Sequence, residues 1–112
     1  MTSTKYPVLE VAILNVRHGQ RDAFLEAFAT AEPLIASMPG YGGHELRRCV
    51  EADERFLLLV WWDTVDSHTV GFRESAAYRE WKTLLHHFYD PFPTVDHYLP
   101  ERGRRPSEDV DA

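Results

Sequence analysis

The feature that most constrains the fold is an uninterrupted apolar run at positions 56–62, which reads Phe-Leu-Leu-Leu-Val-Trp-Trp. Successive side chains of a β-strand point to opposite faces of the sheet, so a strand of this composition must be covered on both faces. Residues 8–16 form a second apolar stretch, which only Glu10 and Asn15 interrupt. We therefore expect two central strands in a sheet that has a protein layer on each side.

Two segments carry apolar residues at the three- and four-residue spacing of an amphipathic helix. In the first, which follows Gly19, these residues are Phe24, Phe28, Ala31, Ile35 and Met38. In the second, which Ser75 caps, they are Tyr78, Trp81, Leu85 and Phe88. Pro33 lies within the first segment and predicts a kinked helix, not two helices. Capping residues also predict a short helix within residues 63–72.

Two further strands, at residues 44–50 and 94–99, complete the order β-α-β-β-α-β, and the polar residues 51–54 predict a hairpin. This order predicts an α+β domain of the ferredoxin-like type, a four-stranded antiparallel sheet with both helices on one face. The other face then needs a cover, and a second copy of the sheet would supply it in a two-fold homodimer. We expect the domain to span residues 1–100 and a mobile, charged tail to follow at residues 101–112.

Composition argues against several classes of partner. The net charge is −6 and Lys and Arg total 12, so no basic face is expected for nucleic acid or an anionic membrane. No apolar run approaches the roughly 18 residues of a membrane span. The N-terminus lacks the apolar stretch of a signal peptide, so we expect a cytoplasmic protein. The single Cys49 can form neither an internal disulfide nor a zinc site on its own.

A series of short motifs resembles the antibiotic biosynthesis monooxygenase family, a group of dimeric α+β barrel proteins. The motifs are Gly19-Gln-Arg-Asp-Ala-Phe24, Glu32-Pro33, Pro39-Gly-Tyr41, Glu45-Leu-Arg-Arg48, Trp62-Asp-Thr-Val-Asp-Ser-His68, then Phe72, Ser75, Tyr78 and Trp81, and finally His97-Tyr98. The resemblance covers residues 8–98. It implies a pocket between sheet and helices in each subunit, with Trp62 among its walls. It also implies oxidation of phenolic compounds by molecular oxygen without metal or flavin.

Another branch of the same family degrades haem with three residues. These are an asparagine on the first strand, the tryptophan that ends the third strand, and a histidine on the second helix. The tryptophan matches Trp62, but Ala12 stands where the asparagine belongs and Phe72 where the histidine belongs. Two of the three residues are missing, so haem degradation is not expected.

His68 is the candidate catalytic residue, because an imidazole with an ordinary pKa of about 6.5 can accept a phenolic proton at neutral pH. Its alternative is a solvated position on a helix surface. Trp62 is expected to stack on a flat substrate, with Phe72, Tyr78 and Trp81 around the cavity. The alternative for these aromatic residues is packing alone, in the core or at a dimer interface.

No metal site is expected, although His86, His87 and His97 offer imidazoles. Neighbouring helix positions face different ways, and no carboxylate or thiol stands at a ligand spacing. The resemblance implies a cofactor-independent monooxygenase that oxidises a small phenolic or quinol-type aromatic with molecular oxygen. The alternative is a non-catalytic, small-molecule-binding dimer of the same fold, which the expected shortage of polar residues in the pocket favours.

Overall fold

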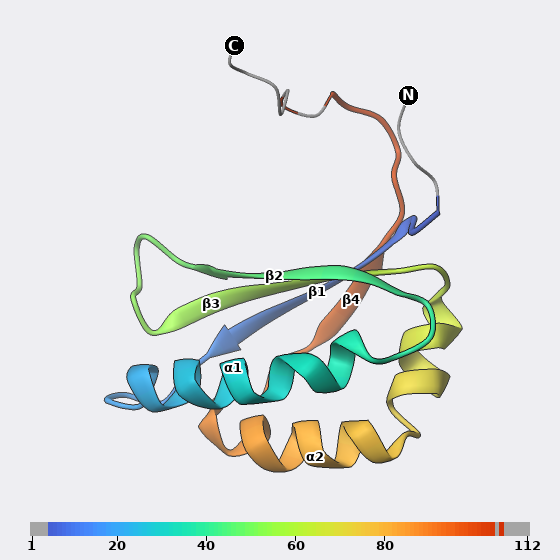
Figure 1. Ribbon diagram of the computed structural model, residues 1–112. Coiled ribbons are helices and arrows are strands. Elements are labelled where there is room, and N and C mark those ends of the chain that lie inside the picture. The colour runs from blue at the N-terminus through green and yellow to red at the C-terminus, as the bar shows by residue number, and fades with distance from the viewer. Residues whose placement is uncertain (1–4, 105, 107–112) are drawn as a thin grey trace.

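The computed structural model describes residues 5–104 and 106, and its elements follow the predicted order (Figure 1). The strands are β1 (Val8–Asn15), β2 (Tyr41–Arg48), β3 (Arg55–Trp62) and β4 (Val95–Tyr98). The helices are α1 (Arg21–Ala36), a short π-helix (Ser67–Phe72), α2 (Ala76–Leu85) and a 3-10 turn (His86–Phe88). β2 begins at Tyr41 and not at position 44, because Gly40, with a φ of 86°, turns the chain directly into the sheet.

The four strands form one antiparallel sheet in the order β2-β3-β1-β4, and α1 and α2 cover the same face (Figure 1). This is the predicted ferredoxin-like α+β arrangement, with β2 and β4 as its open edges. β1 and β3 pair along their whole length, from Val8 opposite Trp62 to Asn15 opposite Arg55. The two apolar segments therefore occupy the middle of the sheet, as their composition predicts.

The core fills the space between the helices and the sheet. Helix residues Phe24, Phe28, Ala31, Ile35, Trp81 and Leu85 are buried there. The central strands contribute Val8, Ala12, Leu14, Phe56, Leu58, Val60 and Trp62. α1 continues through Pro33 as one helix and not two, as predicted, and the kink stays a prediction. Met38 lies beyond the end of α1 and packs only partly against the core.

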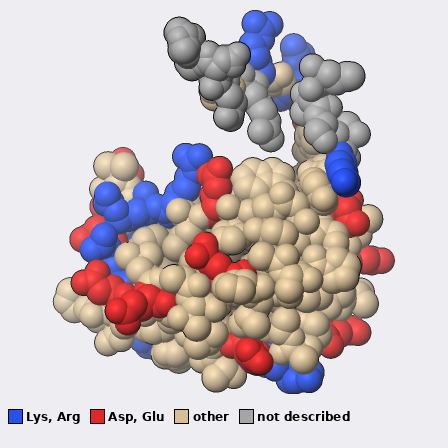
Figure 2. Space-filling model, in the orientation of Figure 1, with Lys and Arg blue, Asp and Glu red and all other residues tan. Residues whose placement is uncertain are grey.

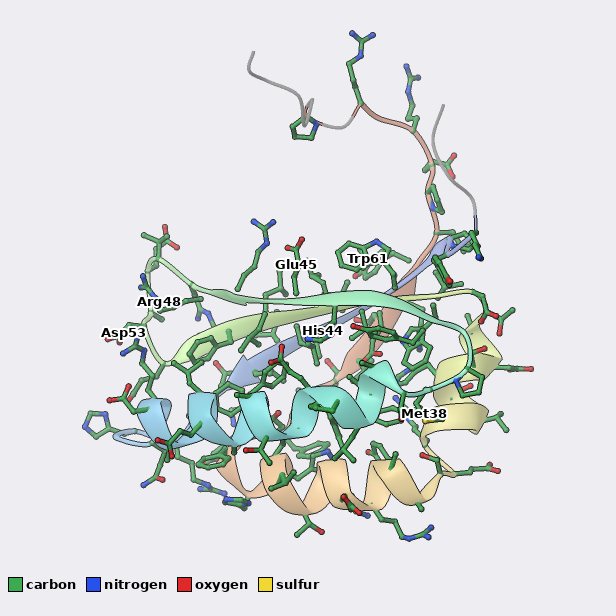
Figure 3. The ribbon with its side chains drawn as sticks, viewed as in Figure 1. Met38, His44, Glu45, Arg48, Asp53 and Trp61 are labelled. Atoms are coloured by element: carbon green, nitrogen blue, oxygen red, sulfur yellow. The ribbon has the colours of Figure 1, made fainter. Side chains whose placement is uncertain are left out.

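The opposite side of the sheet, called here the outer sheet face, carries apolar side chains from both central strands. They form three facing pairs: Leu9 with Trp61, Val11 with Leu59, and Ile13 with Leu57. Ile13 is 53% exposed, the other five are half-buried, and Trp61 points away from the helices (Figure 3). No helix among the described residues covers this face. The homodimer expected from the sequence therefore remains a prediction.

Basic side chains gather at the hairpin end of β2 and β3, where Arg47, Arg48 and Arg55 lie, while acidic side chains are spread around the remaining visible surface (Figure 2). Within the described part of the chain, no helix is long and apolar enough to span a membrane. Residues 101–104 form neither helix nor strand, and positions 105 and 107–112 of the predicted tail lie outside the described residues. The domain boundary and the cytoplasmic location stay predictions.

Candidate active site

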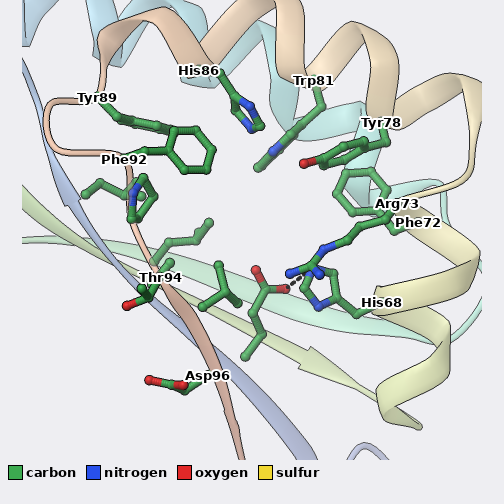
Figure 4. Close-up of a pocket in the computed structure, with 16 residues that line it drawn as sticks. His68, Phe72, Arg73, Tyr78, Trp81, His86, Tyr89, Phe92, Thr94 and Asp96 are labelled. Atoms are coloured by element: carbon green, nitrogen blue, oxygen red, sulfur yellow. Dashed lines mark ion pairs between the residues drawn. The ribbon is translucent and has the colours of Figure 1, made fainter.

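A cavity of about 650 Å³ lies between the sheet and the α2 side of the helix layer (Figure 4). This volume is within the usual range of small-molecule sites, about 300–1,000 Å³. Its floor comes from Glu10, Ala12 and Leu14 of β1 and Leu58 of β3. Its walls come from the π-helix, from α2 and from the segment that leads into β4.

Aromatic rings face the cavity from two ends. At one end lies the aromatic wall, which consists of Phe72, Tyr78 and Trp81. Phe72 meets the other two rings edge-on, with centroid distances of 5.1 Å to Tyr78 and 5.6 Å to Trp81. At the other end, His86 packs edge-on against Phe92 at 4.9 Å. Such walls favour a flat and mainly apolar ligand.

A polar cluster of Glu10, His68 and His97 lies on the sheet side of the cavity. Oε1 of Glu10 accepts a hydrogen bond from Nε1 of Trp62 at 2.9 Å. The same oxygen lies 3.4 Å from Nε2 of His68, the contact that is dashed in Figure 4. Nδ1 of His68 is 2.8 Å from Nε2 of His97. The His68 ring also stacks on Trp62, with centroids 5.5 Å apart and planes inclined by 20°. β1, β4 and the π-helix therefore supply the cluster, and β3 places Trp62 against it.

Strand alternation and strand register explain how the cluster forms. Glu10 shares the helix-facing side of β1 with Val8 and Ala12. It stands opposite His97 of β4, so the two side chains lie on the same face of the sheet. His68 approaches from the π-helix, whose wide turn is closed by the N–H of Arg73, which donates to the carbonyl of His68 at 3.1 Å.

Burial governs protonation in the polar cluster. Burial raises the pKa of Glu10 to about 7, against the opposing effects of the Trp62 hydrogen bond and the Arg73 charge. Burial lowers the pKa of His68 to about 3, and Arg73 and His97 lower it further. Burial and Arg73 also lower the pKa of His97. His68 is therefore a neutral imidazole at neutral pH, so its contact with Glu10 is not an ion pair.

The structure places four of the five residues predicted for the site at the cavity. His68 is 3% exposed and lines it, which excludes the solvated surface position. Phe72, Tyr78 and Trp81 line it as well. Trp62 is fully buried behind His68 and is not part of the lining, so it reaches the cavity only through the residues that it contacts. The functional roles of all five stay predictions.

Other lining and neighbouring residues are not among those predicted from sequence. The expected shortage of polar residues is wrong, because Glu10, His68, Arg73, His86 and Asp96 line the cavity. The sequence does contain a signal that could have identified Glu10. It is the one charged residue of β1, and strand alternation puts it on the same face as the buried apolar residues. No comparable signal joins His97 to His68, because they lie 29 residues apart and meet only through the register of β4.

The histidines of the chain do not converge on a metal site in the described structure. His86 lines the cavity beside Phe92, whereas His87 packs against Phe88. Among residues 5–104 and 106, no three His, Cys, Asp or Glu side chains are grouped so that they could hold a metal ion. Independence from a metal remains a prediction about the reaction.

The chain is similar to known proteins over most of its length. The family model described as antibiotic biosynthesis monooxygenase matches residues 7–84. YczJ, an uncharacterised protein of Bacillus subtilis strain 168, is 50% identical over 91 residues, which cover 81% of this chain and 96% of YczJ. The solved structure of a candidate antibiotic biosynthesis monooxygenase from Bordetella bronchiseptica is 36% identical, with a TM-score of 0.80 over 84% of this chain and 96% of that one.

Two solved oxygenases share the fold at lower identity. A monooxygenase from the ActVA-Orf6 gene of Streptomyces coelicolor, solved with the ligand nanaomycin D, has a TM-score of 0.77 at 16% identity, over 94% of this chain and 96% of that one. SnoaB of Streptomyces nogalater, a cofactor-independent oxygenase, has a TM-score of 0.66 at 22% identity, over 93% of this chain and 98% of that one. At these identities the likeness is one of fold.

Proposed function

This chain belongs to the antibiotic biosynthesis monooxygenase family, and we propose that it oxidises a small phenolic or quinol-type aromatic with molecular oxygen, without a bound metal or flavin. The family and the similarity to the Bordetella bronchiseptica protein support the reaction class. The fold shared with SnoaB, a cofactor-independent oxygenase, supports a reaction that needs no cofactor.

One observation carries this proposal: the cavity joins aromatic walls to a buried carboxyl-imidazole pair. A flat ring can lie against the aromatic wall while its hydroxyl group faces Glu10 and His68. The walls then orient the ring and exclude water, and the polar pair handles the proton. A purely structural cavity has no need of a buried carboxyl group beside a buried imidazole.

The chemistry requires the phenol to be ionised. Loss of the hydroxyl proton leaves an electron-rich anion that can pass an electron to dioxygen. For a phenol with a free para position, one oxygen atom enters the ring as a second carbonyl, and the other leaves as water. The ring supplies the four electrons that reduce dioxygen. The protein's contribution is to move the proton, to orient the ring and to exclude solvent.

The predicted site residues keep distinct places in this reaction. His68 serves proton transfer through Glu10, which it contacts at 3.4 Å. The aromatic wall holds the ring. Trp62 supports both polar side chains from behind, since its indole N–H binds Glu10 and its ring stacks on His68.

We also propose that the protein works as a homodimer closed through the outer sheet face. Six apolar side chains lie there on two paired strands, and no described helix covers them. An apolar surface of this kind on a sheet is typical of a protein interface. A second copy related by two-fold symmetry would bury the same residues on both subunits.

Oxygen uptake with a panel of phenols and quinols tests the function. We expect uptake that a metal chelator leaves unchanged, and one atom of labelled dioxygen in the organic product. Ala12→Leu, which enlarges a side chain on the cavity floor, should raise KM for the substrate found. Saturable binding of a phenol without oxygen uptake by any compound of the panel would instead favour the non-catalytic binding dimer.

A further inference from the structure

We propose that Glu10 is the catalytic base of this site and that His68 and His97 are positioning residues. His97 orients the His68 ring, and His68 holds an N–H toward the Glu10 carboxylate. The assignment rests on the proposed function, since it names the proton acceptor of that reaction. It differs from the prediction from sequence, which gives this part to His68.

The contacts of His68 leave it no nitrogen for a substrate. Its Nδ1 meets Nε2 of His97 at 2.8 Å, and its Nε2 meets Oε1 of Glu10 at 3.4 Å. A neutral imidazole has one N–H and one acceptor nitrogen, whereas a carboxylate only accepts. The consistent assignment therefore has His97 donating to Nδ1 of His68, and Nε2–H of His68 pointing to Glu10.

Glu10, by contrast, keeps one carboxyl oxygen for a ligand. Its contacts with Trp62 and His68 both involve Oε1, while the residue itself lines the cavity, so Oε2 is the oxygen that a ligand would meet. Two N–H groups directed at one oxygen hold the carboxyl group in place for proton transfer at the other. The 3.4 Å contact is long for a hydrogen bond, and such contacts commonly shorten when substrate binds.

The proton follows a closed route in this scheme. The phenol O–H bond breaks as an O–H bond forms at Oε2 of Glu10, and the electrons left on the phenolate go to dioxygen. Glu10 then returns the proton to the oxygen atom that leaves as water. The second hydrogen of that water is the ring hydrogen that the incoming oxygen displaces. Glu10 ends each cycle as a carboxylate, and no electron passes through the polar cluster.

The surroundings suit Glu10 as a base better than His68. Burial brings the pKa of Glu10 to about 7, close to the pH at which a general base is most effective. The positive charge of Arg73, in the cavity lining, favours the carboxylate, and His97 and Asp96 are the other titratable groups on the β4 side. His68 would have to become a buried cation, which burial and Arg73 both oppose.

Substitution of Glu10 tests the base directly. We expect Glu10→Gln to lower kcat/KM by about 10²- to 10⁴-fold and to remove the acid limb of the pH profile near pH 7. Glu10→Asp should keep that limb at a reduced rate, and the exposed control Glu26→Gln should match the parent. Thermal melting checks that each variant is folded. A Glu10→Gln enzyme that keeps both rate and acid limb overturns the assignment.

Substitution of His68 separates positioning from direct catalysis. His68→Leu removes the donor to Glu10, so we expect a loss of roughly 10- to 100-fold and an acid limb that moves to higher pH. His68→Gln places an amide N–H near the position of Nε2. It should restore part of the rate and move the acid limb part of the way back to its pH in the parent. If the acid limb instead disappears in His68→Leu and persists in Glu10→Gln, then His68 is the base.

NMR of the unliganded protein gives a readout that needs no turnover. We expect the Glu10 carboxyl carbon to titrate near pH 7 and the ring nitrogens to show His68 as the Nε2–H tautomer. Both results can stand even if no phenol is oxidised, so a failure of the proposed function is seen separately. A Glu10 signal that titrates near the ordinary value of 4.5, or an Nδ1–H tautomer of His68, overturns the assignment whatever the oxygen assay shows.

Discussion

Trp62 donates its indole N–H to Oε1 of Glu10 across 2.9 Å, and both side chains are buried. The bond joins the two central strands on their helix-facing side, next to the cavity. It also lowers the pKa of a carboxyl group whose charged form burial disfavours. The packing of the sheet and the protonation of the candidate site are therefore linked through one hydrogen bond.

Trp62→Phe should raise the pKa of Glu10 above its value of about 7, because the variant lacks the donor that favours the carboxylate. The free energy of unfolding should fall by roughly 1–3 kcal/mol, since a buried acceptor loses its partner. NMR titration of the carboxyl carbon and urea unfolding measure the two effects. Trp61→Phe, on the opposite face, is the control and should leave the pKa of Glu10 unchanged. An identical titration in Trp62→Phe and the parent would contradict the linkage.

Glu10→Gln should change how stability depends on pH. The folded pKa of Glu10, about 7, is above its ordinary 4.5, so its contribution to stability is complete below pH 4.5 and is lost as the pH rises through about 7. The variant has no such loss. Between these pH values, the free energy of unfolding of the variant should therefore rise by roughly 3 kcal/mol relative to that of the parent. Urea unfolding at a series of pH values measures the difference, and a constant difference would refute the raised pKa.

His68→Ala should destabilise the fold by roughly 2 kcal/mol or more at pH 7, because the ring is 3% exposed and stacks on Trp62. The folded pKa of His68, about 3, is below 6.5, so its stabilising effect is present above pH 6.5 and decreases as the pH falls toward 3. Calorimetry should show that the difference in stability between the parent and His68→Ala becomes smaller as the pH is lowered. His18→Ala, whose side chain is 99% exposed, should behave like the parent.

The outer sheet face should mediate assembly. We expect light scattering at micromolar concentration to give a dimer, with an apolar interface of about 2,000 Å² or more in total. Leu59→Lys, which places a charge in the middle of this face, should shift the protein toward monomers. Val50→Lys, at an 85% exposed position outside the strands, should remain dimeric. A parent protein that scatters as a stable monomer would remove the case for a second sheet.

Haem should bind weakly at most and should survive a reductant and oxygen. Ala12 and Phe72 both line the cavity, so the two positions that carry polar residues in the haem-degrading branch are apolar here. Absorbance spectroscopy after addition of haem and ascorbate checks this outcome. A Soret band that bleaches to a biliverdin-like spectrum would place the chain in that branch after all.

The fold could be predicted because its determinants are local to each segment. The apolar run at residues 56–62 requires cover on two faces wherever it lies, and the stripe that contains Phe24 and Phe28 requires a helix. Alternation alone separates Trp61 from Trp62 onto opposite faces. The structure agrees on the central position of this run, on the helix and on the separation of the two tryptophans, while cover of the outer sheet face stays a prediction.

The candidate site could be predicted only in part, because it depends on how the segments meet. Strand alternation does not show which of the two tryptophans faces the helices. The sequence therefore could not predict that Trp62 lies behind His68. The same holds for His97, which joins the polar cluster through the register that sets it opposite Glu10. The sequence also left open whether His68 faces the cavity or the solvent, and the structure shows that it faces the cavity.

Because of the π-helical turn at Ser67–Phe72, the side chains that line the cavity at this point can change in evolution while the rest of the fold stays the same. A π-helical turn holds one residue more than an α-helical one, closed here between His68 and Arg73. Deletion of one residue between His68 and Phe72 would let the turn close as an α-helix and would change which side chain follows His68 toward the cavity. The sheet, α1 and α2 would need no change. A deletion or insertion of a single codon at this point could thus change the residues that line the cavity without a change of fold.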